Sequence, residues 1–225
     1  SSIYLFYFLI MLKAFIIICS SFLVGCNQAK SIEKESSSQN SKTFNMNQKI
    51  DTITLGGGCY WCMEAIFQRL KGVENIESGF SGGAMKNPTY REVCTGQTGH
   101  AEVVQITYDG SIVSFPEILK IFFTMHDPTT LNRQGNDRGT QYRSVIFYRN
   151  EQQKMTAEDL IKALNKSNAY PAPIVTEVKP FEVFYKAEDY HQNYYNENSE
   201  EGYCRFVIQP KIEKFEKVFK DYAKH

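Results

Sequence analysis

The stretch that organises the chain reads GGGCYWCME and covers residues 56–64. It follows residues 50–55, in which apolar and polar side chains alternate as in a strand, and it opens a segment from Cys59 to Leu70 with apolar residues at helical spacing. We expect the three glycines to make a tight turn, because glycine has no Cβ to clash there. The pattern therefore predicts a strand, a turn and a helix, with Cys59 at the N-terminus of the helix.

That position favours an anion, because free backbone N–H groups and the positive end of the helix dipole point toward it. We therefore expect a lowered pKa for Cys59 and a nucleophilic thiolate. The alternative is a buried structural cysteine, which is the ordinary situation for a cysteine in a helix. The glycines before Cys59 and the rings of Tyr60 and Trp61 after it favour the nucleophile, because neither feature serves ordinary helix packing.

The composition is that of a globular protein. The chain has 225 residues, 42% of them hydrophobic, with 25 basic and 25 acidic side chains, which suffices for one well-buried domain. The absence of a basic excess gives no indication of a nucleic-acid partner. Six cysteines in a chain of this length do not make a disulfide-rich scaffold.

Residues 1–26 differ from the rest and are similar to a bacterial lipoprotein signal. A short basic start at Met11 precedes the apolar residues 14–23, and a small residue precedes Cys26. We expect cleavage just before Cys26, lipidation of Cys26, and a true start at Met11. The alternative is an uncleaved membrane helix over residues 3–24.

Residues 27–48 are rich in Ser, Asn, Gln and Lys and cannot form a core, so they predict a flexible tether. We expect the folded catalytic domain over residues 49–225. With a lipid on Cys26, this domain would lie outside the cytoplasm, anchored to a bacterial membrane and facing the periplasm or the cell surface.

Further elements follow from periodicity and turn residues. We predict strands over residues 73–80, 101–108, 142–148, 174–178 and 203–208. We predict helices over residues 114–125, 151–166 and 211–222, and a short element over residues 90–96. Strands and helices mix without strict alternation or an internal repeat, which indicates one α+β domain of two layers.

Glu102 lies in the predicted strand over residues 101–108, on the same face as Val104 and Ile106. Burial without a positive partner would raise its pKa and keep it protonated, as a proton donor near neutral pH. The alternative is that Glu102, near the beginning of the strand, points into solvent. The alternation alone leaves both possibilities open.

Three motifs occur together in a fixed order: GCYWCME at residues 58–64, TGHAE at residues 98–102 and QGNDRGTQYRS at residues 134–144. In combination they resemble the peptide methionine sulfoxide reductase A family. The likeness extends from about residue 52 to beyond Cys204. A Cys-X-X-Cys alone would be weak evidence for this family, whereas three long motifs in the right order are specific to it.

The resemblance implies a ferredoxin-like α/β core with extra C-terminal segments and reduction of the S epimer of methionine sulfoxide, free or in oxidised proteins. It implies no bound cofactor or metal, a thioredoxin-like reductant as electron donor, and a monomer. Cys59 would attack the sulfoxide sulfur and become a sulfenic acid. Glu102 would protonate the departing oxygen.

The same matching assigns the substrate pocket. Tyr90, Asp137 and Tyr142 would hydrogen-bond the sulfoxide oxygen, while Tyr60 and Trp61 would enclose the methyl group. The family commonly has Phe where this chain has Tyr60, which adds a hydroxyl to the wall.

A second thiol would then form a disulfide for the reductant to open. Cys204 matches the usual resolving position, but the family's Gly-rich tail with a further cysteine is missing, and residues 205–208 resemble an ordered strand. Cys204 is therefore either the resolving thiol or a buried, inert one. Cys62 is the second candidate, with helix packing as its preferred explanation, and Cys94 is expected to be structural.

Three rival functions remain. One is a membrane-tethered thiol–disulfide oxidoreductase that uses Cys59 and Cys62. Another is zinc binding by Cys59, Cys62, Cys94 and His100, although no second paired-ligand motif follows. The third is a lipoprotein without enzymatic activity.

Overall fold

The computed structural model describes residues 49–224. The strands are β1 (Ile50–Gly57), β2 (Val73–Ser81), β3 (Ala101–Asp109), β4 (Arg133–Gln134), β5 (Asp137–Arg138), β6 (Ser144–Tyr148), β7 (Glu177–Pro180) and β8 (Phe184–Lys186). The helices are α2 (Tyr60–Phe67), α3 (Tyr90–Cys94), α4 (Phe115–Met125), α5 (Glu151–Lys166), α6 (Tyr194–Glu197) and α7 (Gln209–Val218), with short helices η1 (Thr140–Tyr142), η2 (Asp189–His191) and η3 (Cys204–Ile208).

The predicted signal segment with its lipidation site Cys26, and the predicted tether over residues 27–48, lie outside the described residues. Within residues 49–224, no helix combines the length and the apolar character that crossing a membrane requires.

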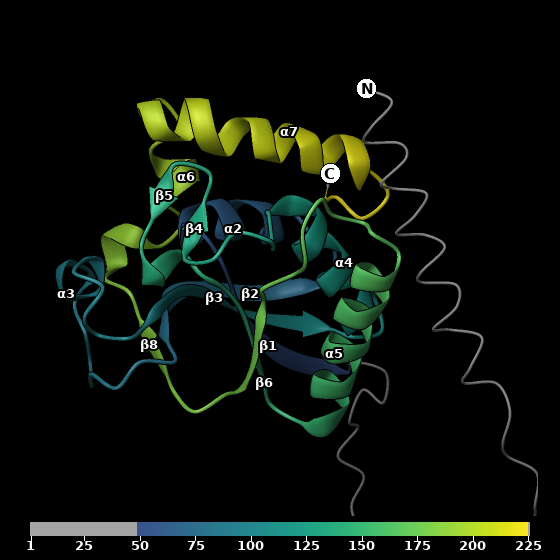
Figure 1. Cartoon of the computed structure of the whole chain (residues 1–225). Helices are drawn as coiled ribbons and strands as arrows, with labels where there is room; N and C mark the ends of the chain where they lie inside the picture. The colour runs from purple at the N-terminus through teal and green to yellow at the C-terminus, as the bar shows by residue number, and fades with distance from the viewer. Residues whose placement is uncertain (1–48, 225) are drawn as a thin grey trace, which may run out of the picture.

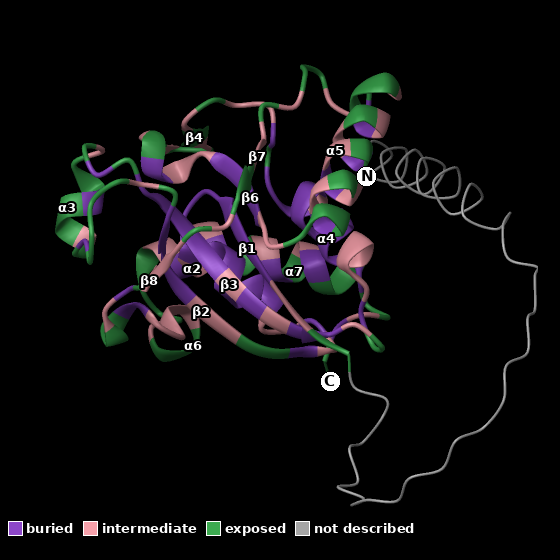
Figure 2. Ribbon diagram, turned by 90° about the horizontal axis from the view of Figure 1, so that it is seen from below, coloured by how far each residue is buried: buried purple, intermediate pink, exposed green. Residues whose placement is uncertain are grey.

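The fold is a mixed α/β one built on a six-stranded sheet in the order β7-β6-β1-β3-β2-β8 (Figure 1). Neighbouring strands are antiparallel except β6 and β7, which are parallel. The short strands β4 and β5 form a separate hairpin. The two central strands, β1 and β3, are largely buried, as the purple ribbon in Figure 2 shows.

Helices α2 and α4 cover one face of this sheet, and α7 lies across them on the side away from the strands (Figure 1). Helix α7 thus adds a layer to the two that the sequence predicts. The opposite face carries a small apolar cluster in which Val103, Val145 and Phe147 pack against Phe181 and Phe184. The main core therefore lies between the sheet and α2, the helix that follows the glycines.

The helices with clear caps were predicted most accurately. Helix α4 begins after Ser114, whose backbone and side chain both contact the Glu117 carboxylate in a capping box. Helix α5 has the predicted bounds, and the side chain of its N-cap, Asn150, accepts a hydrogen bond from the Gln153 backbone N–H.

The glycine turn is shorter than predicted. Gly56 and Gly57 belong to β1, and Gly58 alone forms the turn, with a φ of +95° that favours glycine. A Cβ on Gly58 would lie 2.6 Å from Cγ of Gln134. A Cβ on Gly56 would lie 2.8 Å from Cγ1 of Val145, so this glycine lets β6 approach β1.

The prediction of a strand over residues 203–208 was wrong, because Cys204–Ile208 is a π-helix that continues into α7. The apolar, branched residues there imitate a strand. However, buried Cys204, Ile208 and Ile212 recur every fourth residue, and Phe206 between them is 78% exposed, which is a helical pattern. The predicted strand over residues 174–178 is displaced toward β7, and β6 begins two residues later than predicted.

Candidate active site

The site forms where four strands meet at one end of the sheet. Strands β1 and β2 end there, and their antiparallel partners β3 and β6 begin there: Gly57 pairs with Ser144, and Phe80 pairs with Glu102. The segments that enter or leave these strands therefore converge. The sheet thereby brings together motifs that lie more than 80 positions apart in the sequence, from Gly58 to Ser144.

A pocket of about 180 Å³ opens at this end of the sheet. Every catalytic and substrate-binding residue expected from the sequence lines it, with Tyr203 in addition. The lining residues are Cys59, Tyr60, Trp61, Tyr90, Glu102, Asp137, Tyr142 and Tyr203. Cys204 does not line this pocket.

Cys59 is the N-cap of α2 and is 8% exposed, so its thiol is accessible only through the pocket. Its carbonyl accepts a hydrogen bond from the Cys62 backbone N–H at 3.1 Å, which closes the first turn of the helix. The thiol therefore lies at the helix N-terminus, as the glycine pattern predicts.

The expected lowering of the Cys59 pKa is not found. Burial raises the pKa of the Cys59 thiol, and the hydrogen bond to Cys62 and the negative charge of Glu102 raise it further. The pKa of Cys62 is lowered instead, by the hydrogen bond with Cys59 and by the positive charge of Lys211, against the effect of burial. The two thiols therefore titrate as a pair, in which the surroundings of Cys62 favour the thiolate more than those of Cys59 do.

Glu102 is buried, with 1% of its surface exposed, and faces the pocket. Its Oε2 accepts one hydrogen bond, from the Tyr60 backbone N–H at 3.1 Å. Burial raises the pKa of Glu102 to about 8 despite this hydrogen bond, and the charges of Asp137 and Cys62 also raise it. Below that pH the carboxyl carries a proton directed to the same pocket as Cys59.

Three tyrosine hydroxyls face the pocket from different elements. Tyr90 opens α3, Tyr142 ends η1 and Tyr203 precedes η3. Burial raises the pKa of each of them, so all three hydroxyls stay protonated and can donate hydrogen bonds. The Tyr203 hydroxyl donates to Oδ2 of Asp137 at 2.8 Å, which ties the β4–β5 hairpin to the start of η3.

The apolar wall consists of stacked rings. Tyr60 is buried, with its ring centroid 6.0 Å from Trp61 and 5.9 Å from Phe80. Trp61 stacks on Tyr194 with ring centroids 3.7 Å apart and an interplanar angle of 7°. Within residues 49–224, the Tyr60 hydroxyl has no hydrogen-bond partner.

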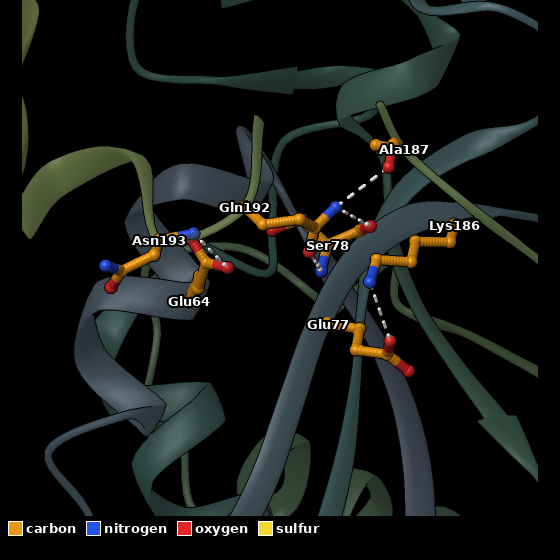
Figure 3. Close-up of polar contacts among 7 residues, drawn as sticks. All are labelled: Glu64, Glu77, Ser78, Lys186, Ala187, Gln192 and Asn193. Atoms are coloured by element: carbon orange, nitrogen blue, oxygen red, sulfur yellow. Dashed lines mark hydrogen bonds and ion pairs between the residues drawn. The ribbon is translucent and has the colours of Figure 1, made fainter. Parts of the chain in front are cut away.

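A clamp behind this wall fixes the segment that carries Tyr194 (Figure 3). The Gln192 amide bonds both the N–H and the carbonyl of Ser78 in β2, at 2.9 Å each, and the carbonyl of Ala187 at 3.0 Å. The Glu64 carboxylate of α2 accepts hydrogen bonds from the backbone N–H groups of Asn193 and Tyr194. The stack against Trp61 is therefore held from both the sheet and the helix.

Cys204 is fully buried at the start of η3 and belongs to the main core. Burial raises the pKa of its thiol, and the charge of Cys62 raises it further. Its surroundings match the inert alternative that the sequence left open. Cys94 is exposed on α3.

The four proposed zinc ligands do not form a metal site. Across residues 49–224, no three His, Cys, Asp or Glu side chains come together in a way that could hold a metal ion. The His100 ring is engaged by backbone instead: Nδ1 contacts the Gly83 N–H at 3.1 Å, and Nε2 contacts the Met85 carbonyl at 2.7 Å.

Tyr203, His191 and Lys211 are the site residues that the sequence did not indicate. The His191 ring is buried beside Tyr90, with centroids 4.3 Å apart, and burial lowers its pKa, so it remains neutral. Lys211 reaches Cys62 from α7. The sequence could have indicated only Tyr203, through its position beside Cys204. The places of His191 and Lys211 depend on tertiary packing.

A buried thiol pair, a protonated carboxyl and convergent tyrosine hydroxyls around one small pocket define a cysteine-dependent oxidoreductase site. Comparison with known proteins specifies the class. A family model described as peptide methionine sulfoxide reductase matches residues 51–223. The chain belongs to the peptide methionine sulfoxide reductase family.

Individual relatives align with this chain over nearly their whole length. The chain is 58% identical over 175 residues to peptide methionine sulfoxide reductase MsrA of Saccharolobus solfataricus, which covers 78% of this chain and 98% of that protein. It is 52% identical over 172 residues to the protein of the same name from Trichodesmium erythraeum, which covers 76% and 97%.

Two solved structures share the fold. Methionine sulfoxide reductase A of Corynebacterium diphtheriae superposes with a TM-score of 0.62 at 40% identity, covering 70% of this chain and 78% of that chain. Reduced Mxr1 from Saccharomyces cerevisiae gives a TM-score of 0.63 at 32% identity, covering 74% and 96%.

Proposed function

We propose that the chain reduces the S epimer of methionine sulfoxide, protein-bound or free, to methionine through a sulfenic acid on Cys59. It is a peptide-methionine (S)-S-oxide reductase, a thiol-dependent enzyme of protein repair. The observation that carries the mechanism is the pocket in which the Cys59 thiol and the protonated Glu102 carboxyl face the same small volume.

The pocket suits both ends of a sulfoxide. The S–O bond is strongly polar, and the hydroxyls of Tyr90 and Tyr142 can donate hydrogen bonds to its oxygen. The methyl group is small and apolar, and it fits against the rings of Tyr60 and Trp61. Asp137, held by Tyr203, fixes the polar side of the pocket.

In the first step, Cys59 Sγ attacks the sulfoxide sulfur, and its thiol proton passes to the Cys62 sulfur to which it is hydrogen-bonded. Glu102 donates its proton to the sulfoxide oxygen, which removes the charge that would otherwise develop there. The oxygen then transfers to Cys59 and methionine leaves. The methionine sulfur is reduced by two electrons, and Cys59 is oxidised by the same two to a sulfenic acid.

The test is turnover of separated S and R epimers of a methionine sulfoxide peptide with dithiothreitol as reductant. We expect methionine from the S epimer with the native chain and none with Cys59→Ser. Equal use of both epimers, or an unaffected Cys59→Ser variant, would overturn the proposal.

A general thiol–disulfide oxidoreductase would use Cys59 and Cys62 but would have no use for the buried acid at Glu102 or for the hydroxyls of Tyr90 and Tyr142. The sulfoxide function explains these groups, which is why we prefer it. An insulin-reduction assay separates the two functions: only the oxidoreductase would accelerate insulin precipitation while leaving methionine sulfoxide unchanged.

For regeneration we propose a thioredoxin-like dithiol as the electron donor, with no bound cofactor or metal. A cysteine disulfide is the form of the enzyme that such a donor reduces. Multiple turnover with thioredoxin, thioredoxin reductase and NADPH tests this, and a requirement for small thiols alone would contradict it.

We also propose that Cys26 carries a lipid and holds a monomeric enzyme on the outer side of a bacterial membrane. The support is the basic and apolar pattern of residues 1–26 followed by the polar residues 27–48. The native chain should partition with membranes, and Cys26→Ala should not be lipidated. Light scattering of the domain gives the oligomeric state, and a dimeric mass would contradict a monomer.

Finally, we propose that the centre of the fold is a ferredoxin-like plait. Its support is the order β6-β1-β3-β2 with antiparallel neighbours, together with α2 between β1 and β2 and α4 between β3 and β6. An experimental structure with another central strand order would reject it.

A further inference from the structure

The first turn of α2 places a second thiol directly beside the reactive one. Cys59 is the N-cap and Cys62 lies in the first turn, and their side chains are hydrogen-bonded. Cys-X-X-Cys at a helix N-terminus is an arrangement that redox enzymes use for disulfide exchange. No change in the backbone of another element is needed to bring these two sulfurs together.

Cys62 is also prepared to act as a nucleophile. The positive charge of Lys211 on α7 stabilises a thiolate there, and the Tyr203 hydroxyl lies 3.8 Å from Cys62 Sγ. Attack on a sulfenic acid requires a thiolate, so surroundings that stabilise a thiolate at Cys62 favour this step once Cys62 has lost its proton.

Cys204 lacks these features. Its side chain is fully buried and does not line the pocket, and burial favours the neutral thiol. It also belongs to the continuous buried stripe of η3 and α7 with Ile208 and Ile212, so moving it to Cys59 would disturb the packing of α7.

We propose that Cys62, rather than Cys204, is the thiol that resolves the Cys59 sulfenic acid, with Lys211 on α7 as its positioning residue. This inference rests on the proposed function, because it requires the sulfenic acid that sulfoxide reduction generates.

The step balances without another oxidant. After the first step, Cys62 releases to solvent the proton that it took from Cys59, and the Glu102 carboxylate takes up a proton from solvent. The Cys62 thiolate then attacks Cys59 Sγ, the S–S bond forms and the S–O bond breaks, and the departing hydroxide takes the Glu102 proton and leaves as water. Cys59 gains one electron and Cys62 loses one, and a dithiol of the thioredoxin class afterwards reduces the disulfide.

The test uses one equivalent of the S sulfoxide without reductant, acid quench and tryptic mapping of the non-reduced protein. Cys59 and Cys62 share the peptide of residues 50–69, whereas Cys204 lies in the peptide of residues 187–205. We expect the first peptide to be lighter by two hydrogen atoms and unlinked. A covalent link between the two peptides would overturn the proposal.

Two matched variants make the same distinction chemically. Cys62→Ser should form up to one equivalent of methionine more slowly, because Cys62 accepts the Cys59 proton, and it should leave a sulfenic acid that dimedone labels. Its thioredoxin-driven turnover should fall by at least about 100-fold, because an intramolecular attack is lost. Cys204→Ser should close the disulfide. A Cys62→Ser variant that closes a disulfide, together with a Cys204→Ser variant that accumulates the sulfenic acid, would reject Cys62. A native chain that forms no methionine would instead reject the proposed function.

Lys211→Met tests the positioning role through a pH profile. Without the ammonium group the thiolate is less favoured, so disulfide closure, measured after the first step is complete, should shift to higher pH. Lys217→Met, on an exposed position of the same helix, is the control. An identical profile for both variants would remove Lys211 from the proposal.

Discussion

Two carboxyl groups, Glu64 in α2 and Glu102 in β3, are each 1% exposed, yet their surroundings differ. Glu64 accepts a hydrogen bond from the Asn193 backbone N–H at 2.9 Å (Figure 3) and another from the Tyr194 backbone N–H at 3.3 Å. Glu102 accepts a single backbone hydrogen bond, from Tyr60, and faces the pocket. Burial alone therefore does not mark a catalytic acid.

The two carboxyl groups differ in the hydrogen bonds that counteract the effect of burial on their pKa. Burial raises the pKa of both groups, and a nearby negative charge raises each further. Two backbone hydrogen bonds counteract this at Glu64, whereas only the one from Tyr60 does so at Glu102. We infer that the hydrogen bonds of Glu64 hold two segments together and that Glu102 retains a proton for chemistry. Substitutions of Glu102 and Glu64 separate these two roles.

The largest effect is expected from Glu102→Gln. The amide keeps the size and can accept the Tyr60 hydrogen bond but cannot give a proton, so kcat should fall by about 10²- to 10⁴-fold. Steady-state formation of methionine at pH 7 measures it. The fold should remain, because the buried side chain becomes permanently neutral; a variant within threefold of the native rate, roughly 0.6 kcal/mol, would remove the acid role.

The pH profile of the native enzyme should lose activity above the Glu102 pKa of about 8. Each further pH unit removes roughly 90% of the remaining protonated carboxyl, so kcat/KM should decline about tenfold per unit. The Glu102→Gln variant should not show this decline of kcat/KM with rising pH. A native profile that stays flat from pH 7 to pH 9.5 would contradict the assignment.

The same group gives a prediction for stability. Its folded-state pKa of about 8 exceeds the exposed value of about 4.3, so the folded protein binds the extra proton between these values. The Glu102 contribution to the free energy of unfolding should be complete below pH 4 and should be lost as the pH rises to about 8. Urea unfolding of the native chain and Glu102→Gln at pH 5 and 9 measures it, and a constant difference would contradict it.

Glu64→Ala should affect stability more than catalysis. It leaves the partly buried N–H groups of Asn193 and Tyr194 without their acceptor, which should lower the free energy of unfolding by about 1–3 kcal/mol. Urea denaturation at pH 7 provides the value. The control is Glu77→Gln, which removes the partly exposed ion pair with Lys186 (Figure 3) and should cost about 0–1 kcal/mol. Equal losses in both variants would show that Glu64 is not a clamp.

The smallest effect is expected from Tyr60→Phe. The hydroxyl is buried, and within residues 49–224 it has no hydrogen-bond partner, so its removal should be neutral or stabilising by up to about 1 kcal/mol. The wall of the pocket should persist, with kcat/KM within about threefold of the native value. A loss beyond tenfold would mean that this hydroxyl contacts the substrate.

Much of the fold could be predicted from local patterns. The capped helices α4 and α5, and the strands β1, β2 and β3, appear where periodicity placed them. Residues 203–208 could not be assigned locally, because apolar branched residues suit a strand and a buried helix alike, and packing against α2 decides between them.

The site shows the same division. The motifs indicated the groups that line the pocket. The alternation put Glu102 on the strand face of Val104 and Ile106 but left open whether its side chain is buried or points into solvent. The protonation of the thiol pair was not predictable, because Lys211 and Tyr203 reach Cys62 only through the docking of α7 and η3. Burial and neighbouring charges outweigh the dipole of an eight-residue helix at Cys59.

The most direct test is the protonation state of Glu102, observed by infrared difference spectroscopy of the native chain against Glu102→Gln. We predict the carbonyl band of a neutral carboxyl at pH 7, absent from the variant, that gives way to a carboxylate signal with a midpoint near pH 8. A Glu102 carboxylate already ionised at pH 6 would contradict its role as the proton donor.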